Sequence, residues 1–98
     1  MTVEIHVEGQ VATGRMPEFA VAIEDYKDFA KTHDYAVPRV LLGLSGEMNT
    51  VRLVYDFDSA ADYEAQELRT LRDEEYGAVA GRLGFADRTL HYMLYRGI

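Results

Sequence analysis

Apolar and polar residues alternate over several short stretches of this chain, as expected for strands with one buried face. The first such stretch runs from residue 2 to residue 13, with Val3, Ile5 and Val7 on its apolar side. The polar side of this stretch carries Glu4, His6 and Glu8. Gly9 interrupts the alternation, which predicts a bulge or a bend in the strand.

Three later stretches show the same period of two. Pro38 marks the start of a second strand that should end near Ser45, and residues 51–57 and 87–96 form the third and fourth strands. Their apolar sides carry Val40, Leu42 and Leu44, then Val51, Leu53, Tyr55 and Phe57, then Leu90, Tyr92 and Leu94. Residues 46–49 predict a hairpin turn between the second and third strands, with Asn49 as a turn residue.

Helical spacing of apolar residues appears between these strands. Pro17 suits the first turn of a helix that runs to about Thr32. Ser59, three residues before Asp62, predicts the N-cap of another helix, and the acidic residues 73–75 predict a break and a short third helix ending near Gly84. The stripes expected to face the core are Phe19, Ile23, Tyr26 and Ala30 in the first helix and Ala61, Ala65, Leu68 and Leu71 in the second.

The resulting order of strand, helix, strand, strand, helix, strand predicts an α+β fold of the ferredoxin-like βαββαβ type. In this arrangement a four-stranded antiparallel sheet carries its helices on one face, and the first strand lies between the third and the fourth. The 98 residues are expected to form one domain, residues 1–98, with a core that is only marginally sufficient for a monomer.

The face of the sheet without helices would be mixed in character. It would combine charged residues of the first and third strands with Leu41, Val54, Met93 and Tyr95. Such a mixture suits neither a solvated surface nor a monomer core, so it favours a sheet-to-sheet homodimer interface.

Composition excludes several classes of function. Seventeen acidic and ten basic residues leave a net charge of −7, which argues against a nucleic-acid partner because phosphate binding needs a basic face. The absence of cysteine excludes disulfide scaffolds, thiolate metal sites and cysteine nucleophiles. No apolar run approaches the length of a membrane span and no signal segment is present, so we expect a cytoplasmic protein without a membrane partner.

The passage from the third strand into the second helix, NTVRLVYDFDSAADYEA at residues 49–65, is the most distinctive part of the sequence. Its asparagine, apolar strand, alternating aromatic and acidic residues, Asp-Ser turn and alanine-rich helix resemble the NIPSNAP-like family of the dimeric α+β barrel superfamily. Residues 73–76 and the opening Val3-Glu4-Ile5 support this resemblance, although Tyr76 stands where the family usually has tryptophan.

This resemblance implies homodimerisation through the open sheet faces and a pocket between sheet and helices in each subunit. Related branches of the superfamily include cofactor-independent quinone-forming monooxygenases, haem-degrading enzymes and polyketide cyclases. The fold alone does not specify which activity is present.

Candidate catalytic residues lie on the predicted open face. His6 stands between Glu4 and Glu8, and His91 on the neighbouring strand would lie within reach, so either imidazole could act as a general base. Tyr95 could orient an enolate or phenolate. The alternative is that His6 hydrogen-bonds to Arg52 or to a carboxylate in a dimer interface. No metal site and no cofactor are expected, because no ligand pair with metal-binding spacing anchors the two histidines.

The chain has seven tyrosines and four phenylalanines, more aromatic residues than the helix stripes require. These side chains could form an aromatic wall that binds a flat or hydrophobic molecule, or they could simply pack. The candidate ligand-binding residues are Tyr26, Tyr55, Tyr63, Tyr76 and Tyr92, together with Arg52 as a partner for an acidic group.

Two hypotheses follow from these observations. The first is a small homodimeric NIPSNAP-like protein that binds a small apolar or aromatic molecule without catalysis. The second is a cofactor-independent monooxygenase or cyclase that acts on an aromatic or polyketide-type substrate with a histidine base.

Overall fold

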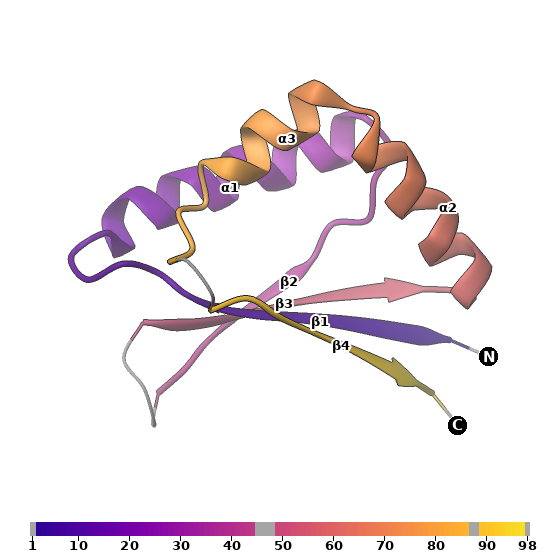
Figure 1. Cartoon of the computed structure of the whole chain (residues 1–98), viewed down its shortest axis with the longest axis horizontal. Coiled ribbons are helices and arrows are strands. Elements are labelled where there is room, and N and C mark those ends of the chain that lie inside the picture. The colour runs from indigo at the N-terminus through magenta and orange to yellow at the C-terminus, as the bar shows by residue number, and fades with distance from the viewer. Residues whose placement is uncertain (1, 45–48, 87–88, 98) are drawn as a thin grey trace.

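The computed structural model describes residues 2–44, 49–86 and 89–97 of the chain (Figure 1). The elements follow the predicted order, and the helical region after the third strand is divided in two as expected. They are β1 (Val3–Gln10), α1 (Met16–Thr32), β2 (Arg39–Leu42), β3 (Thr50–Phe57), α2 (Ala60–Leu71), α3 (Glu74–Gly81) and β4 (His91–Arg96).

The four strands form one antiparallel sheet in the order β2-β3-β1-β4. The central strand β1 pairs with β3 on one side and with β4 on the other, which confirms the predicted topology. All three helices lie on one face of this sheet, and the described part of the chain leaves the other face uncovered (Figure 1). The α+β, ferredoxin-like fold is therefore confirmed.

The core lies between the sheet and the helix layer. Its buried residues come mainly from the apolar sides of β1 and β3 and from the inner stripe of α1, as the alternation and the helical spacing predicted. The core cluster comprises Val3, Ile5, Val7, Val11, Phe19, Ala22, Ile23, Tyr26, Val51, Leu53, Tyr55, Val79 and Leu83.

Side-chain caps set the starts of the last two helices. The Ser59 hydroxyl accepts a hydrogen bond from the Asp62 N–H at 3.1 Å, and the Asp73 carboxylate accepts one from the Tyr76 N–H at 3.1 Å. Each cap satisfies a backbone donor that has no partner within its helix. The predicted helix start and the predicted break are both confirmed.

Gly9 does not form the expected bulge. β1 continues through it in regular register, with Gly9 opposite Val51. A Cβ atom at this position would lie only 2.7 Å from Cδ1 of Phe85, so glycine instead allows an aromatic ring to pack directly on the strand.

The second and fourth strands are shorter than the alternation predicted, since β2 ends at Leu42 and β4 begins at His91. The predicted strand end at Ser45, the hairpin residues 46–48 and the predicted strand start at residues 87–88 lie outside the described residues. Asn49 has a φ of 61°, a left-handed conformation that asparagine tolerates in turns.

The predicted core stripe of the second helix is wrong. Ala61, Ala65, Leu68 and Leu71 are all exposed, and α2 contains no buried residue. The half-buried residues of α2 are instead Tyr63, Gln66 and Thr70, which follow a second helical spacing. Only Asp58 and Ser59 connect β3 to α2, and in the folded chain α2 turns this second stripe toward the sheet.

Candidate functional site

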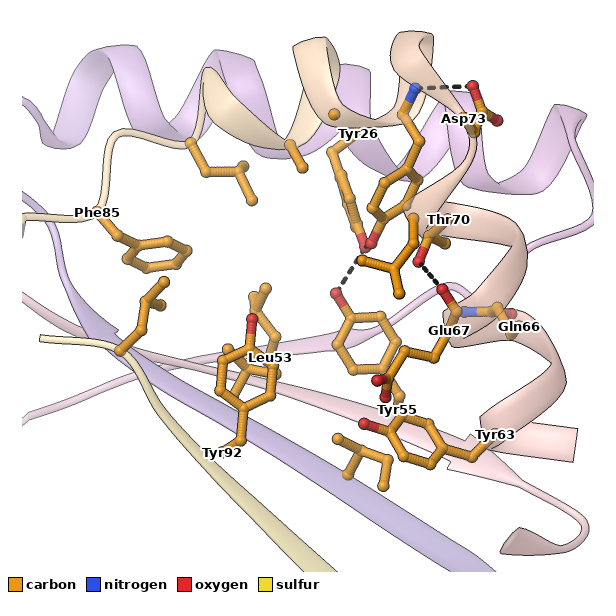
Figure 2. Close-up of a pocket in the computed structure, with 18 of the residues that line it drawn as sticks. Tyr26, Leu53, Tyr55, Tyr63, Gln66, Glu67, Thr70, Asp73, Phe85 and Tyr92 are labelled. Carbon is orange, nitrogen blue, oxygen red and sulfur yellow. Dashed lines mark hydrogen bonds between the residues drawn. The ribbon is translucent and has the colours of Figure 1, made fainter. Parts of the chain in front are cut away.

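A pocket of about 870 Å³ lies between the helix-facing side of the sheet and the helices (Figure 2). Its floor comes from β1, β3 and β4, and its opposite walls come from α1, α2 and α3. The lining includes aliphatic residues such as Ile5 and Leu53, but tyrosines from five different elements dominate it.

The pocket exists because the helix layer does not cover the whole sheet. Helix α2 places no buried residue against the strands, and the side chains that β4 turns toward the helices are poorly covered. Tyr92 and Leu94, on the helix-facing side of β4, therefore remain 67% and 60% exposed. The pocket opens to solvent along this strand.

All five tyrosines that the sequence suggested for ligand binding line this pocket: Tyr26, Tyr55, Tyr63, Tyr76 and Tyr92. Tyr26 comes from α1 and Tyr55 from β3, and their side chains point toward each other across the core (Figure 2). The Tyr26 hydroxyl lies 2.6 Å from that of Tyr55 and 2.7 Å from that of Tyr76. These three residues, called the tyrosine cluster below, join a helix, the sheet and a second helix through their hydroxyls.

Burial keeps the hydroxyls of the tyrosine cluster protonated. It is the main reason that the pKa values of Tyr26, Tyr55 and Tyr76 lie well above the ordinary tyrosine value. Burial also raises the pKa of Tyr63 to about 12, and the adjacent Glu67 carboxylate contributes to this shift. At neutral pH these phenols are neutral groups.

Three acidic residues, Glu67, Asp73 and Glu74, also line the pocket, and no lysine or arginine is found among the described lining residues. Asp73 accepts a hydrogen bond from the Tyr35 hydroxyl at 2.7 Å as well as from the Tyr76 N–H. These bonds, that of Tyr35 first, hold the pKa of Asp73 below its ordinary value. The charged side chains among the described lining residues of the pocket are therefore all carboxylates, and the tyrosines there are neutral.

Sequence reasoning missed Glu67, Thr70 and Phe85 as lining residues. A signal for the first of them was present, because Glu67 follows Tyr63 by four positions and so shares its helix face. Phe85 gave no such signal, since it reaches the pocket only because Gly9 lets its ring approach β1.

The residues suggested for catalysis lie on the opposite face of the sheet. His6 Nε2 is 2.9 Å from Oε1 of Glu4, and Nδ1 is 3.3 Å from Nη1 of Arg52. Arg52 also donates a hydrogen bond to Glu8, so His6 belongs to a chain of hydrogen-bonded polar side chains. The ring of Tyr95 meets that of His6 edge-on, with centroids 4.5 Å apart.

His91 is exposed and faces the same way as Glu8, its partner in the strand register. His6, His91, Tyr95 and Arg52 therefore share the open face, and none of them lines the pocket. The catalytic role of the first three stays a prediction, and it requires a substrate on the open face. The described residues contain no group of three or more side chains suited to hold a metal ion.

Among the described residues of the open face, only Val54 is buried within the single chain. It is only 2% exposed, although no described helix covers it. In the register it lies between His6 on β1 and Arg39 on β2. Longer side chains on either side thus cover this valine.

No family model matches the chain, and a comparison with curated proteins also found no match. None of the helices in the described part of the chain is long and apolar enough to cross a lipid bilayer. Similarity to known proteins is therefore carried by the three-dimensional structure.

Several solved structures share the fold over nearly their whole length. A NIPSNAP domain protein from Burkholderia xenovorans is 22% identical, with a TM-score of 0.78 covering 100% of this chain and 95% of that one. A NIPSNAP family protein of unknown function from Agrobacterium tumefaciens is 13% identical, with a TM-score of 0.79 covering 96% and 86%. A second NIPSNAP family protein from the same organism is 12% identical, with a TM-score of 0.79 covering 100% and 94%. The resemblance seen in the sequence is thus confirmed at the level of structure, and the chain has the fold of NIPSNAP family proteins.

Proposed function

We propose that this protein binds a small apolar or aromatic molecule in the tyrosine-lined pocket and acts as a homodimer joined through the open sheet face. The observation that carries the proposal is the convergence of five tyrosines from five elements on one pocket of about 870 Å³. Ordinary core packing would not leave such a volume between its aromatic side chains.

The size and lining of the pocket support ligand binding. Pockets for small molecules typically enclose roughly 300–1,000 Å³ and combine apolar walls with a few polar groups. Here Ile5, Leu53 and the aromatic rings supply the apolar walls, and hydroxyls and carboxylates supply the polar groups. Charged substrates of the nucleotide type fit this lining poorly, since the described lining residues offer no cation.

The character of the open face supports a dimer. Leu41 and Tyr95 are 49% and 45% exposed there, while Arg52 is paired with Glu8 and Arg39 with Glu4 and Asp56. A second copy of the same face would cover the apolar residues and leave the charges with partners. The small size of the domain gives this extra burial a physical advantage.

Binding can be tested with N-phenyl-1-naphthylamine, a neutral fluorophore whose emission rises in apolar surroundings. Ala80 lines the pocket, so Ala80→Trp should fill it and weaken binding at least about tenfold. Ala78 is exposed on the same helix and does not line the pocket, so Ala78→Trp is the matched control. Absence of saturable binding to the wild type would refute the pocket proposal.

Assembly can be tested by light scattering at micromolar concentration. The wild type should have twice the 11.1 kDa mass of one chain. Arg52→Glu places a second acid opposite Glu8 and should shift the protein toward monomer, whereas Arg15→Glu, at an exposed helix start, should not. A wild type that remains monomeric would eliminate the dimer.

A further inference from the structure

We propose that the ligand of this pocket is a neutral, flat molecule with a carbonyl-type oxygen that accepts a hydrogen bond from the tyrosine cluster. This inference rests on the proposed function and specifies the class of ligand. It follows from the hydrogen bonds of the cluster, its depth, and the charges and rings around it.

The hydroxyl protons of the tyrosine cluster determine how many hydrogen bonds it can donate. The tyrosine cluster has three hydroxyl protons, one each on Tyr26, Tyr55 and Tyr76, and two close hydrogen bonds, both at the Tyr26 hydroxyl. Each of these bonds uses one proton, so one O–H donor remains, which can turn either to the contact between Tyr55 and Tyr76 or to an acceptor in the pocket. The geometry thus offers one donor from a chain of hydroxyls, and such chains polarise and strengthen one another.

Two residues of the tyrosine cluster are almost completely buried. Tyr26 is 1% exposed and Tyr55 is 9% exposed, so their hydroxyls are largely withdrawn from bulk water. A ligand that covers this donor without accepting its hydrogen bond leaves it unpaired, which costs more than leaving an oxygen with a spare lone pair. An acceptor oxygen on a ligand relieves this cost, and the raised pKa values of the three phenols keep their protons available at neutral pH.

The charged residues that line the described part of the pocket are all acidic. The ionisable groups that line the pocket besides the tyrosines are Glu67, Asp73 and Glu74, and the described lining residues include no cation. Glu67 and Glu74 are exposed, and Glu67 lies beside Tyr63 (Figure 2), so a ligand in the pocket meets these carboxylates. A carboxylate or phosphate would be repelled there, and the net charge of −7 adds to this effect. A neutral acceptor such as a ketone avoids the repulsion.

The arrangement of aromatic side chains in the pocket bears on the shape of the ligand. Tyr63 and Phe57 meet edge-on with ring centroids 5.5 Å apart, and both line the pocket together with Phe85 and Tyr92. Figure 2 shows Phe85, Tyr92, Tyr55 and Tyr63 arranged around the same space. Aromatic walls of this kind favour stacking and edge contacts with a planar molecule.

Three naphthalenes of matched size test the inference by equilibrium dialysis: 2-acetylnaphthalene, 2-ethylnaphthalene and 2-naphthoate. The wild type should bind the ketone roughly fivefold more tightly than the hydrocarbon, as expected for one net hydrogen bond. It should bind the anion more weakly than the ketone. The triple variant Tyr26→Phe, Tyr55→Phe, Tyr76→Phe should bind ketone and hydrocarbon equally, with hydrocarbon affinity unchanged within about twofold.

The triple variant removes hydroxyls that bond to one another, so the loss of both partners together should be tolerated. Tyr95→Phe on the open face is the matched control and should keep the preference for the ketone. A double variant, Glu67→Gln with Glu74→Gln, should narrow the difference between ketone and anion, whereas Glu24→Gln on the exposed side of α1 should not.

A spectroscopic readout avoids dependence on folding of the triple variant. The carbonyl stretching band of isotope-labelled 2-acetylnaphthalene should move to lower frequency on binding to the wild type, and an unshifted band would overturn the inference. Equal affinity of the wild type for ketone and hydrocarbon, both blocked by Ala80→Trp, would also overturn it and leave the proposed function standing. If none of the three compounds binds saturably, the proposed function itself fails.

Discussion

The two faces of the sheet are built by alternate residues of the same strands, yet their chemistry is opposite. Toward the helices, β3 presents Leu53 and Tyr55, and its only polar atom there is a phenol that bonds to another phenol. Away from the helices, the same strand presents Arg52 and Asp56, which pair with charges on β1 and β2. A step of one residue along the strand thus separates a neutral, buried hydrogen-bond network from an ionic, accessible one.

The difference shows whether ion pairs or hydrogen bonds between hydroxyls contribute more to stability and ligand selectivity. Charges on the open face remain in contact with water, so their pairing contributes little to the stability of one chain. The hydroxyls of Tyr26 and Tyr55 are largely withdrawn from bulk water, so hydrogen bonding within the tyrosine cluster affects both stability and selectivity.

Tyr26→Ala should cause the largest loss on the helix side. The side chain is buried, packs at the centre of the core and links two other tyrosines, so its removal should lower the free energy of unfolding by about 3–5 kcal/mol. Tyr95→Ala on the open face should cost less than about 1 kcal/mol. Urea denaturation measures both at a concentration where light scattering gives equal mass; equal losses would remove the contrast between the faces.

Alkaline pH should destabilise the helix side selectively. The pKa values of Tyr26 and Tyr55 are raised by burial, so the folded protein holds protons that the unfolded chain releases above about pH 10. Their contribution to stability is complete below pH 10 and is lost as pH rises, by about 1.4 kcal/mol per pH unit for each.

Tyrosinate absorbance followed together with circular dichroism from pH 8 to 12 measures this effect. Ionisation of the buried tyrosines should accompany unfolding. Full ionisation while the circular dichroism remains native would show that burial does not hold these protons. The double variant Tyr26→Phe, Tyr55→Phe should flatten the decline, and Tyr95→Phe serves as its control.

Ser59→Ala tests the wall of the pocket. The Ser59 hydroxyl caps α2, and loss of this bond should cost about 1 kcal/mol. Because α2 buries no residue, the loss should concentrate in this helix, and hydrogen exchange should increase there more than in α1. Ser59→Asp should retain the cap. Uniform exchange throughout the chain would instead mean that α2 is as firmly attached as the core.

Arg39→Ala should produce the smallest effect. Its side chain is 59% exposed, and its guanidinium nitrogens lie 3.7 Å from carboxylate oxygens of both Glu4 and Asp56. Removal should change the free energy of unfolding by no more than about 0.5 kcal/mol, and added salt should erase the difference. A loss comparable to that of Tyr26→Ala would show that the open-face charges act as a buried network.

Much of the architecture was predictable because it depends on local patterns. Alternation in β1 and β3, the Ser59 cap and the acidic break at Asp73 each report a short-range constraint, and the order of elements then allows few topologies. The lining tyrosines were predictable for the same reason, since Tyr55 and Tyr92 occupy the apolar side of their strands and Tyr26 the inner stripe of α1.

The orientation of α2 was not predictable in this way. The helix carries two stripes, one with Ala61, Ala65 and Leu68 and another with Tyr63, Gln66 and Glu67, and hydrophobicity favours the first. In the folded chain Leu68 is 56% exposed while the second stripe faces the pocket. Helical spacing shows which residues share a face, but which face meets the sheet depends on how the helix is placed in the folded chain.

The sequence by itself determined the order of elements, the two faces of the sheet and the tyrosines that could meet between sheet and helices. Only the tertiary structure decided that a pocket stands there and that the charged residues that line it are acids. The physical reason is the distance along the chain over which each constraint acts. Period and capping act within a few residues, whereas a pocket depends on distances between elements such as α2 and β4, which no local pattern encodes.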